Sequence, residues 1–289
     1  MATPPPSSSA PAPQASPPGL PRDLMPRLLS GLVMAAVSLA LTWWGVWPFA
    51  VLVLAVALIV TWEWGHIVRK AEVDLILVIH GVAVVAAVWL ALMGLTALAI
   101  VALVIGALIA ALLGFDHLGR ISALGVLYAG LPAVALIWFR ASTPHGLTAV
   151  LFLFAVIWGT DTGAYAAGRT FGGPKLMPTF SPNKTWSGLT GGVVTSLLLA
   201  LVFVYFVPGL KAQWLLPVAA GLAVVAQAGD LMESALKRWY GVKDASGLIP
   251  GHGGFMDRVD GMIVAVVVAA IAAAVLNVHA PATALLTGN

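Results

Sequence analysis

The chain has 289 residues, of which 61% are hydrophobic and only 9% are charged, and it contains no cysteine. This composition excludes an ordinary soluble globular protein, and the missing cysteine excludes disulfides, zinc–thiolate sites and thiol nucleophiles. The net charge of +3 does not indicate nucleic-acid binding, because the basic residues lie at the ends of apolar segments, where membrane topology places them. Long apolar runs with short polar breaks predict an all-α, polytopic helical membrane protein.

Residues 1–22 form a tail rich in proline, serine and alanine. Such a segment cannot bury enough apolar surface to fold, so we expect it to be disordered. It also lacks the basic start and the apolar core of a signal peptide. The remaining chain is expected to divide into an N-terminal transmembrane scaffold over residues 23–146 and a C-terminal catalytic transmembrane region over residues 147–289.

Nine apolar spans follow the tail, each close to the roughly 20 residues that cross a bilayer. If the N-terminus is cytoplasmic, twelve of the 14 basic residues lie inside and only Arg140 and Lys211 lie outside. This bias predicts a multi-pass membrane protein with the polar loops 168–187 and 232–260 in the cytoplasm. We expect the membrane to be the bacterial inner membrane. The spans are expected at 27–44, 47–64, 75–93, 95–114, 121–139, 147–167, 188–208, 213–231 and 261–279.

The helix that leaves the eighth span carries a polar face. Four polar side chains stand there at positions i, i+3, i+4 and i+7: Asp230, Glu233, Ser234 and Lys237. A solvated helix end with intrahelical ion pairs would explain this face structurally. Charged groups this dense beside apolar segments are costly in a bilayer, however. We therefore interpret the face as functional, with Ser234 in substrate binding.

Asp257 and Asp260 form a second acidic pair, at the start of the last span. The helix dipole favours acidic residues at such a position, which is a structural explanation. Two carboxylate pairs would nevertheless meet at the cytoplasmic ends of consecutive spans. Mg²⁺ needs few protein carboxylates when substrate phosphates complete its coordination shell. We therefore expect one or two Mg²⁺ ions, held by Asp230, Glu233, Asp257 and Asp260.

A glycine-rich loop over residues 241–254 connects the two acidic pairs. Glycines let backbone N–H groups approach an anion closely, although an ordinary flexible connector would look the same. Cationic side chains in and around the loop would neutralise phosphate charge. They are Lys237, Arg238, Lys243, His252 and Arg258.

A second group of polar residues follows the sixth span. Asp161 lies near the end of that span, where a carboxylate is costly unless it is paired or functional. The positive-inside rule explains Arg169 and Lys175, but it does not explain Asp161. The segment combines basic, glycine and hydroxyl residues, as a triphosphate or head-group binding loop would. Its predicted substrate-binding residues are Asp161, Arg169, Lys175, Ser181, Lys184 and Thr185.

Three further features are predicted to be structural. His80 lies inside an apolar run and is expected to be a packed, hydrogen-bonded core histidine. Glu63 is expected at the membrane interface, between anchoring tryptophans. The pair Gly191-Gly192 is typical of close packing between membrane helices.

A composite motif at residues 234–260 resembles the signature of the phosphatidate cytidylyltransferases: SALKRWYGVKDASGLIPGHGGFMDRVD. The upstream segments QAGDL, DTGAYAAGR and SPNKTW are similar to the same family, so the resemblance covers roughly residues 155–265. Two positions depart from the pattern. Ser187 stands where that family usually has glutamate, and Gly261 stands where a serine is common.

This resemblance implies that CTP and phosphatidic acid give CDP-diacylglycerol and pyrophosphate, with a divalent metal. It implies a bilayer-bound enzyme without a nucleic-acid partner, and a homodimer is an open expectation. The alternatives are a CTP-dependent polyprenol or phytol kinase and, from a different class, a cation channel or transporter. The residues expected to be catalytic are Asp230, Lys237, Arg238, Lys243, Asp244, His252 and Arg258.

Overall fold

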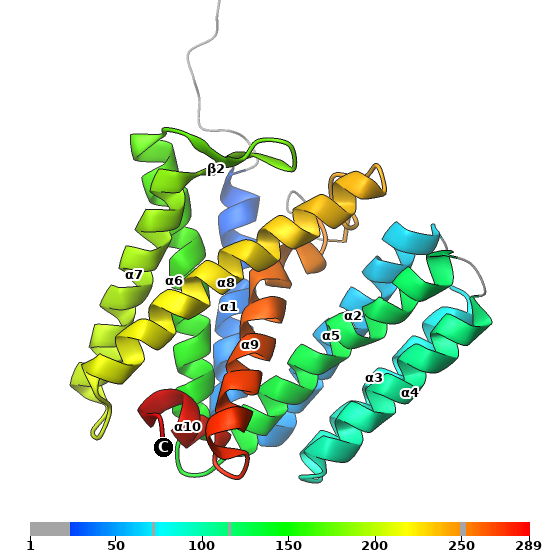
Figure 1. Cartoon of the computed structure of the whole chain (residues 1–289), viewed down its shortest axis with the longest axis horizontal. Helices are drawn as coiled ribbons and strands as arrows, with labels where there is room; N and C mark the ends of the chain where they lie inside the picture. Colours follow the sequence, from blue (N-terminus) through cyan, green and yellow to red (C-terminus); the bar gives the residue numbers. More distant parts are fainter. Residues whose placement is uncertain (1–23, 71–72, 115–116, 249–252) are drawn as a thin grey trace, which may run out of the picture.

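A computed structural model describes residues 24–70, 73–114, 117–248 and 253–289 (Figure 1). The expected tail and His252 lie outside these ranges. In the part described, ten α-helices and one small hairpin make up the chain. The elements are α1 (Leu24–Trp44), α2 (Val46–Arg69), α3 (Leu75–Leu92), α4 (Thr96–Leu113), α5 (His117–Ala141), α6 (Gly146–Phe171), β1 (Lys175–Met177), β2 (Ser181–Thr185), α7 (Trp186–Phe206), α8 (Ala212–Trp239), α9 (Met256–Asn277) and α10 (Pro281–Thr287).

Eight of these helices, α2 to α9, are long and apolar enough to cross a membrane. The prediction of a polytopic helical membrane protein is confirmed. The described apolar part of α1, Leu29–Trp44, is shorter than these eight. Each of the nine expected spans corresponds to one helix, because about 20 consecutive apolar residues are a local signal that needs no knowledge of the neighbours.

Two helices extend beyond their expected apolar spans, and the polar face predicted for the helix leaving the eighth span does lie on α8. The helix α8 continues to Trp239 and α9 already begins at Met256, so much of the expected loop 232–260 is helical. Hydropathy ends a span where charge begins, whereas a helix continues as long as its backbone hydrogen bonds form. The segment after α6 also differs from a plain loop, since Lys175 pairs with Thr185 in an antiparallel hairpin. The short C-terminal α10 was not expected.

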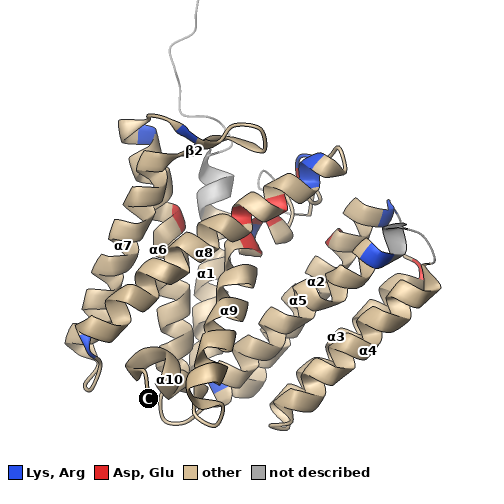
Figure 2. Cartoon of the chain, in the orientation of Figure 1, with Lys and Arg blue, Asp and Glu red and all other residues tan. Residues whose placement is uncertain are grey.

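Figure 1 shows α3 and α4 side by side at one edge of the bundle, next to α2 and α5. In the same view α8 runs obliquely across α6 and α9, both of which it contacts, and α10 lies at the end of the bundle opposite the hairpin. Lys and Arg gather mainly at the hairpin end, and acidic residues gather on α8 near that end (Figure 2). Charge is therefore concentrated at one end of an otherwise apolar bundle.

The pair α6 and α7 is packed through glycines, as the sequence predicts. A β-carbon built at Gly191 would overlap the Ala167 β-carbon, and one built at Gly192 would lie 2.9 Å from the Thr160 carbonyl oxygen. Neither position has room for a side chain. Close backbone approach of this kind is how small residues hold membrane helices together.

A partly buried ion pair connects the scaffold helices α2 and α3. Arg69, at the end of α2, pairs with Asp74 at 2.6 Å, and Asp74 caps α3 by accepting from the Leu77 N–H. His80 is fully buried, so its predicted packing is confirmed. The predicted hydrogen bond is wrong, because neither ring nitrogen has a partner among the described residues.

Candidate active site

A polar cavity of about 750 Å³ lies between α6, α7, α8, α9 and the hairpin. It brings together residues from sequence segments that are far apart. Besides predicted site residues, its lining includes Tyr165, Asn183 and Gln227. Ten predicted site residues line it: Asp161, Arg169, Lys184, Thr185, Asp230, Lys237, Asp244, Asp257, Arg258 and Asp260.

Two glycines bring the acidic ends of α8 and α9 into contact. A β-carbon at Gly229 would lie 3.0 Å from the Asp260 carbonyl oxygen, and one at Gly261 would lie 3.0 Å from the Ala226 carbonyl oxygen. The helices therefore approach each other at the positions next to Asp230 and Asp260. Gly261, which departs from the family pattern, is part of this close approach.

Lys184 connects the hairpin to α8. Its ammonium group lies 2.5 Å from the Asp230 carboxylate and 3.4 Å from the Gln227 carbonyl oxygen. The Gln227 side chain in turn donates to Asp161 on α6 at 3.2 Å. Asp161, a carboxylate that is costly within a span unless it is paired or functional, therefore has a hydrogen-bond partner. Gln227 was not predicted, although an amide within an apolar helix is itself a signal of a buried polar contact.

Thr185 and Ser187 hold the hairpin against the start of α7. The Thr185 hydroxyl caps α7 by accepting from the Gly188 N–H at 3.1 Å. The Ser187 hydroxyl lies 3.0 Å from the Thr185 hydroxyl and donates to the Gly172 carbonyl oxygen. Ser187, the other position that departs from the family pattern, therefore connects the start of α7 to the residue that follows α6.

Lys237 and Asp257 join the end of α8 to the start of α9. The Lys237 ammonium group donates to one oxygen of Asp257 and lies 3.1 Å from Glu233. The other oxygen of Asp257 accepts from the Ala245 N–H at 3.0 Å and from the Gly254 N–H at 2.7 Å. Asp257 therefore binds backbone N–H groups near the beginning and at the end of the glycine-rich loop.

Glu63 has a structural role that the sequence did not predict. Its side chain is fully buried, and its carboxylate accepts from the N–H groups of Phe255 at 2.9 Å and Met256 at 2.6 Å. It also accepts from the Ser246 hydroxyl at 2.5 Å. A carboxylate from α2 thus satisfies unpaired donors at the N-terminus of α9, where the helix dipole favours negative charge.

The tryptophan that follows Glu63 also faces the protein interior. Trp64 is buried, packs against Tyr128 on α5 and donates to the Ile121 carbonyl oxygen at 3.2 Å. These contacts were not predicted, because Glu63 meets residues almost two hundred positions away in the sequence. The available signal was a carboxylate within an apolar helix, which is costly unless it is paired.

Six predicted site residues do not line the cavity. Arg238 follows Lys237 directly on α8, so it points about 100° away around the helix axis and is exposed. Glu233 is buried beside Lys237, behind the cavity wall. Among the described side chains, no group of three or more His, Asp or Glu residues converges as a metal site. The remaining four residues outside the lining are Lys175, Ser181, Ser234 and Lys243.

Comparison with known proteins identifies the family of this chain. The profile of the Cytidylyltransferase family matches residues 25–276. A phosphatidate cytidylyltransferase of Brucella suis biovar 1 (strain 1330) is 37% identical over 245 residues, covering 84% of this chain and 90% of the relative. One of Bacillus subtilis (strain 168) is 34% identical over 263 residues, covering 83% and 94%. The chain belongs to the cytidylyltransferase family.

Proposed function

We propose that the protein transfers the cytidylyl group of CTP to phosphatidic acid and so forms CDP-diacylglycerol and pyrophosphate. Family membership and the named relatives support this activity. The observation that carries it is the cavity at the charged end of a membrane bundle, where cationic and acidic side chains converge from α6, α8, α9 and the hairpin. A soluble nucleotide and a bilayer lipid can both reach such a place.

In this reaction an oxygen of the lipid phosphate attacks the α-phosphorus of CTP, and the bond to the β-phosphate oxygen breaks to release pyrophosphate. The acceptor is already anionic, so no side-chain nucleophile is required. The chief difficulty is bringing two polyanions together. Fixed cations that screen this repulsion and stabilise the developing charge are the main catalytic device in phosphoryl transfer.

The cavity lining provides four cationic side chains that can neutralise phosphate charge, namely Arg169, Lys184, Lys237 and Arg258. Lys184 and Lys237 are held by carboxylates on α8 and α9, so their ammonium groups are positioned before substrate arrives. Preorganised charges of this kind need little rearrangement during the reaction. We assign phosphate contacts to these residues.

We also propose that the enzyme depends on Mg²⁺. Asp230 and Asp260 line the cavity from adjacent helices, and one or two carboxylates together with substrate phosphates are the donors that Mg²⁺ takes. Both oxygens of Asp257 bind Lys237 or backbone N–H groups, and Glu233 lies beside Lys237. The contact of Asp230 with Lys184, and that of Asp260 with the Gly261 N–H, each use one carboxylate oxygen. Asp230 and Asp260 are therefore the ligands we assign. When bound, the ion would neutralise phosphate charge and align the phosphates.

The charge distribution supports a cytoplasmic cavity. Lys and Arg gather at the end of the bundle that holds the site (Figure 2), as the positive-inside rule requires of cytoplasmic loops. We therefore propose that this end faces the cytoplasm, where CTP is available, and that the protein lies in the bacterial inner membrane.

The test uses purified protein, phosphatidic acid, Mg²⁺ and CTP labelled at either the α- or the γ-phosphate. Cytidylyl transfer carries the α-label into the lipid phase and leaves the γ-label in soluble pyrophosphate. A lipid kinase would instead carry the γ-label into lipid, which would refute the proposal. A channel or transporter would leave both labels in CTP.

A further inference from the structure

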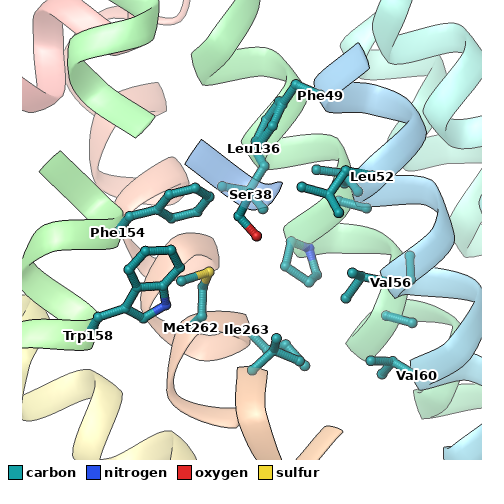
Figure 3. A pocket seen from close by; sticks show the side chains of 16 residues that line it. Ser38, Phe49, Leu52, Val56, Val60, Leu136, Phe154, Trp158, Met262 and Ile263 are labelled. Carbon is teal, nitrogen blue, oxygen red and sulfur yellow. The ribbon is translucent and has the colours of Figure 1, made fainter. Parts of the chain in front are cut away.

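A second cavity, of about 110 Å³, lies against the opposite face of α9 (Figure 3). At about 100° per residue, Val259, Met262 and Ile263 cluster on one side of this helix, and Asp257 and Asp260 lie on the other. The helix α9 therefore separates the polar cavity of the candidate active site from an apolar cavity.

The wall of this second cavity is almost entirely hydrocarbon. Ser38 on α1 brings the one hydroxyl group of the described lining, and the other side chains come from α2, α5, α6 and α9. Figure 3 shows Phe154 and Trp158 on one side and Val56 and Val60 on the other. Water needs two to four polar partners in such a space, so an apolar cavity of this kind stays dry and accepts hydrocarbon.

The two cavities share a second helix as well. On α6, Trp158 lines the apolar cavity and Asp161 lines the polar cavity, less than one helical turn further along. The surfaces of α6 and α9 thus border both spaces. The ligand that fits this arrangement is an amphiphile with an anionic head group and a hydrocarbon tail.

We propose that the apolar cavity holds part of one acyl chain of the phosphatidic acid whose phosphate reacts in the polar cavity, so that its lining determines acyl-chain selectivity. This inference rests on the proposed function. Lipid tails are as apolar as this lining, so burial in the cavity gains little over the bilayer. Selection must therefore come from shape, through packing that admits some chains and excludes others.

The test is to fill the cavity and measure chain selectivity. Ala133 on α5 is buried and lines it, so Ala133→Leu enlarges a side chain that faces the space. The matched control is Ala269→Leu, which makes the same change at a buried position of a separate apolar cavity lined by α8, α9 and α10. The assay compares kcat/KM for dioleoyl and dioctanoyl phosphatidic acid in detergent micelles, together with KM for CTP.

Overpacking should lower the ratio of long-chain to short-chain kcat/KM about tenfold in Ala133→Leu. The control should keep the wild-type ratio, and KM for CTP should be unchanged in both variants. Equal ratios in all three proteins would overturn the inference and leave the proposed function intact. Absence of CDP-diacylglycerol from the wild type would refute the proposed function itself.

A second measurement uses the unmodified chain, in case Ala133→Leu does not fold. Phosphatidic acid with a photoreactive diazirine on one acyl chain should label α2 or α5 at lining positions such as Val56 and Ala133. Unlabelled phosphatidic acid should compete, and phosphatidylcholine should not. Labelling confined to exposed residues of α3 and α4, or equal competition by both lipids, would overturn the inference.

Discussion

Replacing Glu63 by alanine should loosen the active site, although this residue does not line the polar cavity. Its carboxylate accepts from the N–H groups of Phe255 and Met256 and from the Ser246 hydroxyl. These contacts connect α2 to the start of α9 and to the glycine-rich loop. Without them, the segment that carries Asp257 and Asp260 loses its attachment to the scaffold.

The size of the effect follows from the buried donors. Each N–H left without an acceptor costs about 1–3 kcal/mol, so the two backbone groups together cost about 2–6 kcal/mol. This is a large part of the roughly 5–15 kcal/mol that stabilises a typical domain. The first turn of α9 can reduce the cost by fraying towards water, and the catalytic carboxylates then lose their positions.

Glu63→Gln should have an intermediate effect, because an amide keeps one acceptor oxygen but turns an N–H₂ group towards other donors. The control is Thr61→Ala on the same helix. The Thr61 hydroxyl is also buried but donates only to the Ala57 carbonyl oxygen within α2, so its loss should cost about 1 kcal/mol.

The assays are thermal unfolding in detergent, turnover of CTP with phosphatidic acid, and limited proteolysis of residues 241–248. Glu63→Ala should lower Tm, lower kcat and expose the loop to protease, with Glu63→Gln between it and the wild type. Wild-type turnover and wild-type protease resistance in Glu63→Ala would refute the reasoning, because the loop would then hold its position without this carboxylate.

Three further predictions concern the polar cavity. Lys237→Gln should reduce kcat/KM for CTP about a hundredfold, whereas its neighbour Arg238→Gln, outside the cavity, should change it by less than about threefold; equal losses would contradict the assignment. Gly229→Ala should lower stability by about 1–3 kcal/mol through overpacking against α9, measured as a lower Tm; an unchanged Tm would show that the helices can separate freely. Chelation by EDTA should abolish turnover, and Asp260→Asn should raise the Mg²⁺ concentration needed for half-maximal rate; full activity in EDTA would exclude the metal role.

Helix ends show where sequence reasoning stopped being sufficient. The apolar runs located α1 to α9, because hydropathy is carried by neighbouring residues. The same signal marks only the apolar parts of α8 and α9, whose helices include charged residues up to Trp239 and from Met256 onwards. Backbone hydrogen bonding continues through charged residues, and hydropathy does not report it.

The site residues could be predicted only in part, because the sequence does not show which distant segments pack together. Spacing along one helix identifies a polar face, as for Asp230 and Lys237, but it does not show which neighbours turn into the cavity. Arg238 and Lys243 belong to the same motif and yet are exposed. The sequence also contains no local sign that Lys184, from the hairpin, pairs with Asp230 on α8.

The membrane class, the succession of apolar helices and the family can be read from composition and from motifs along the chain. The contact of Glu63 with the start of α9, and the position of α9 between a polar and an apolar cavity, are visible only in the folded protein. The physical reason is that burial and hydrogen bonding depend on which distant segments pack together. Side-chain identity alone does not specify that packing.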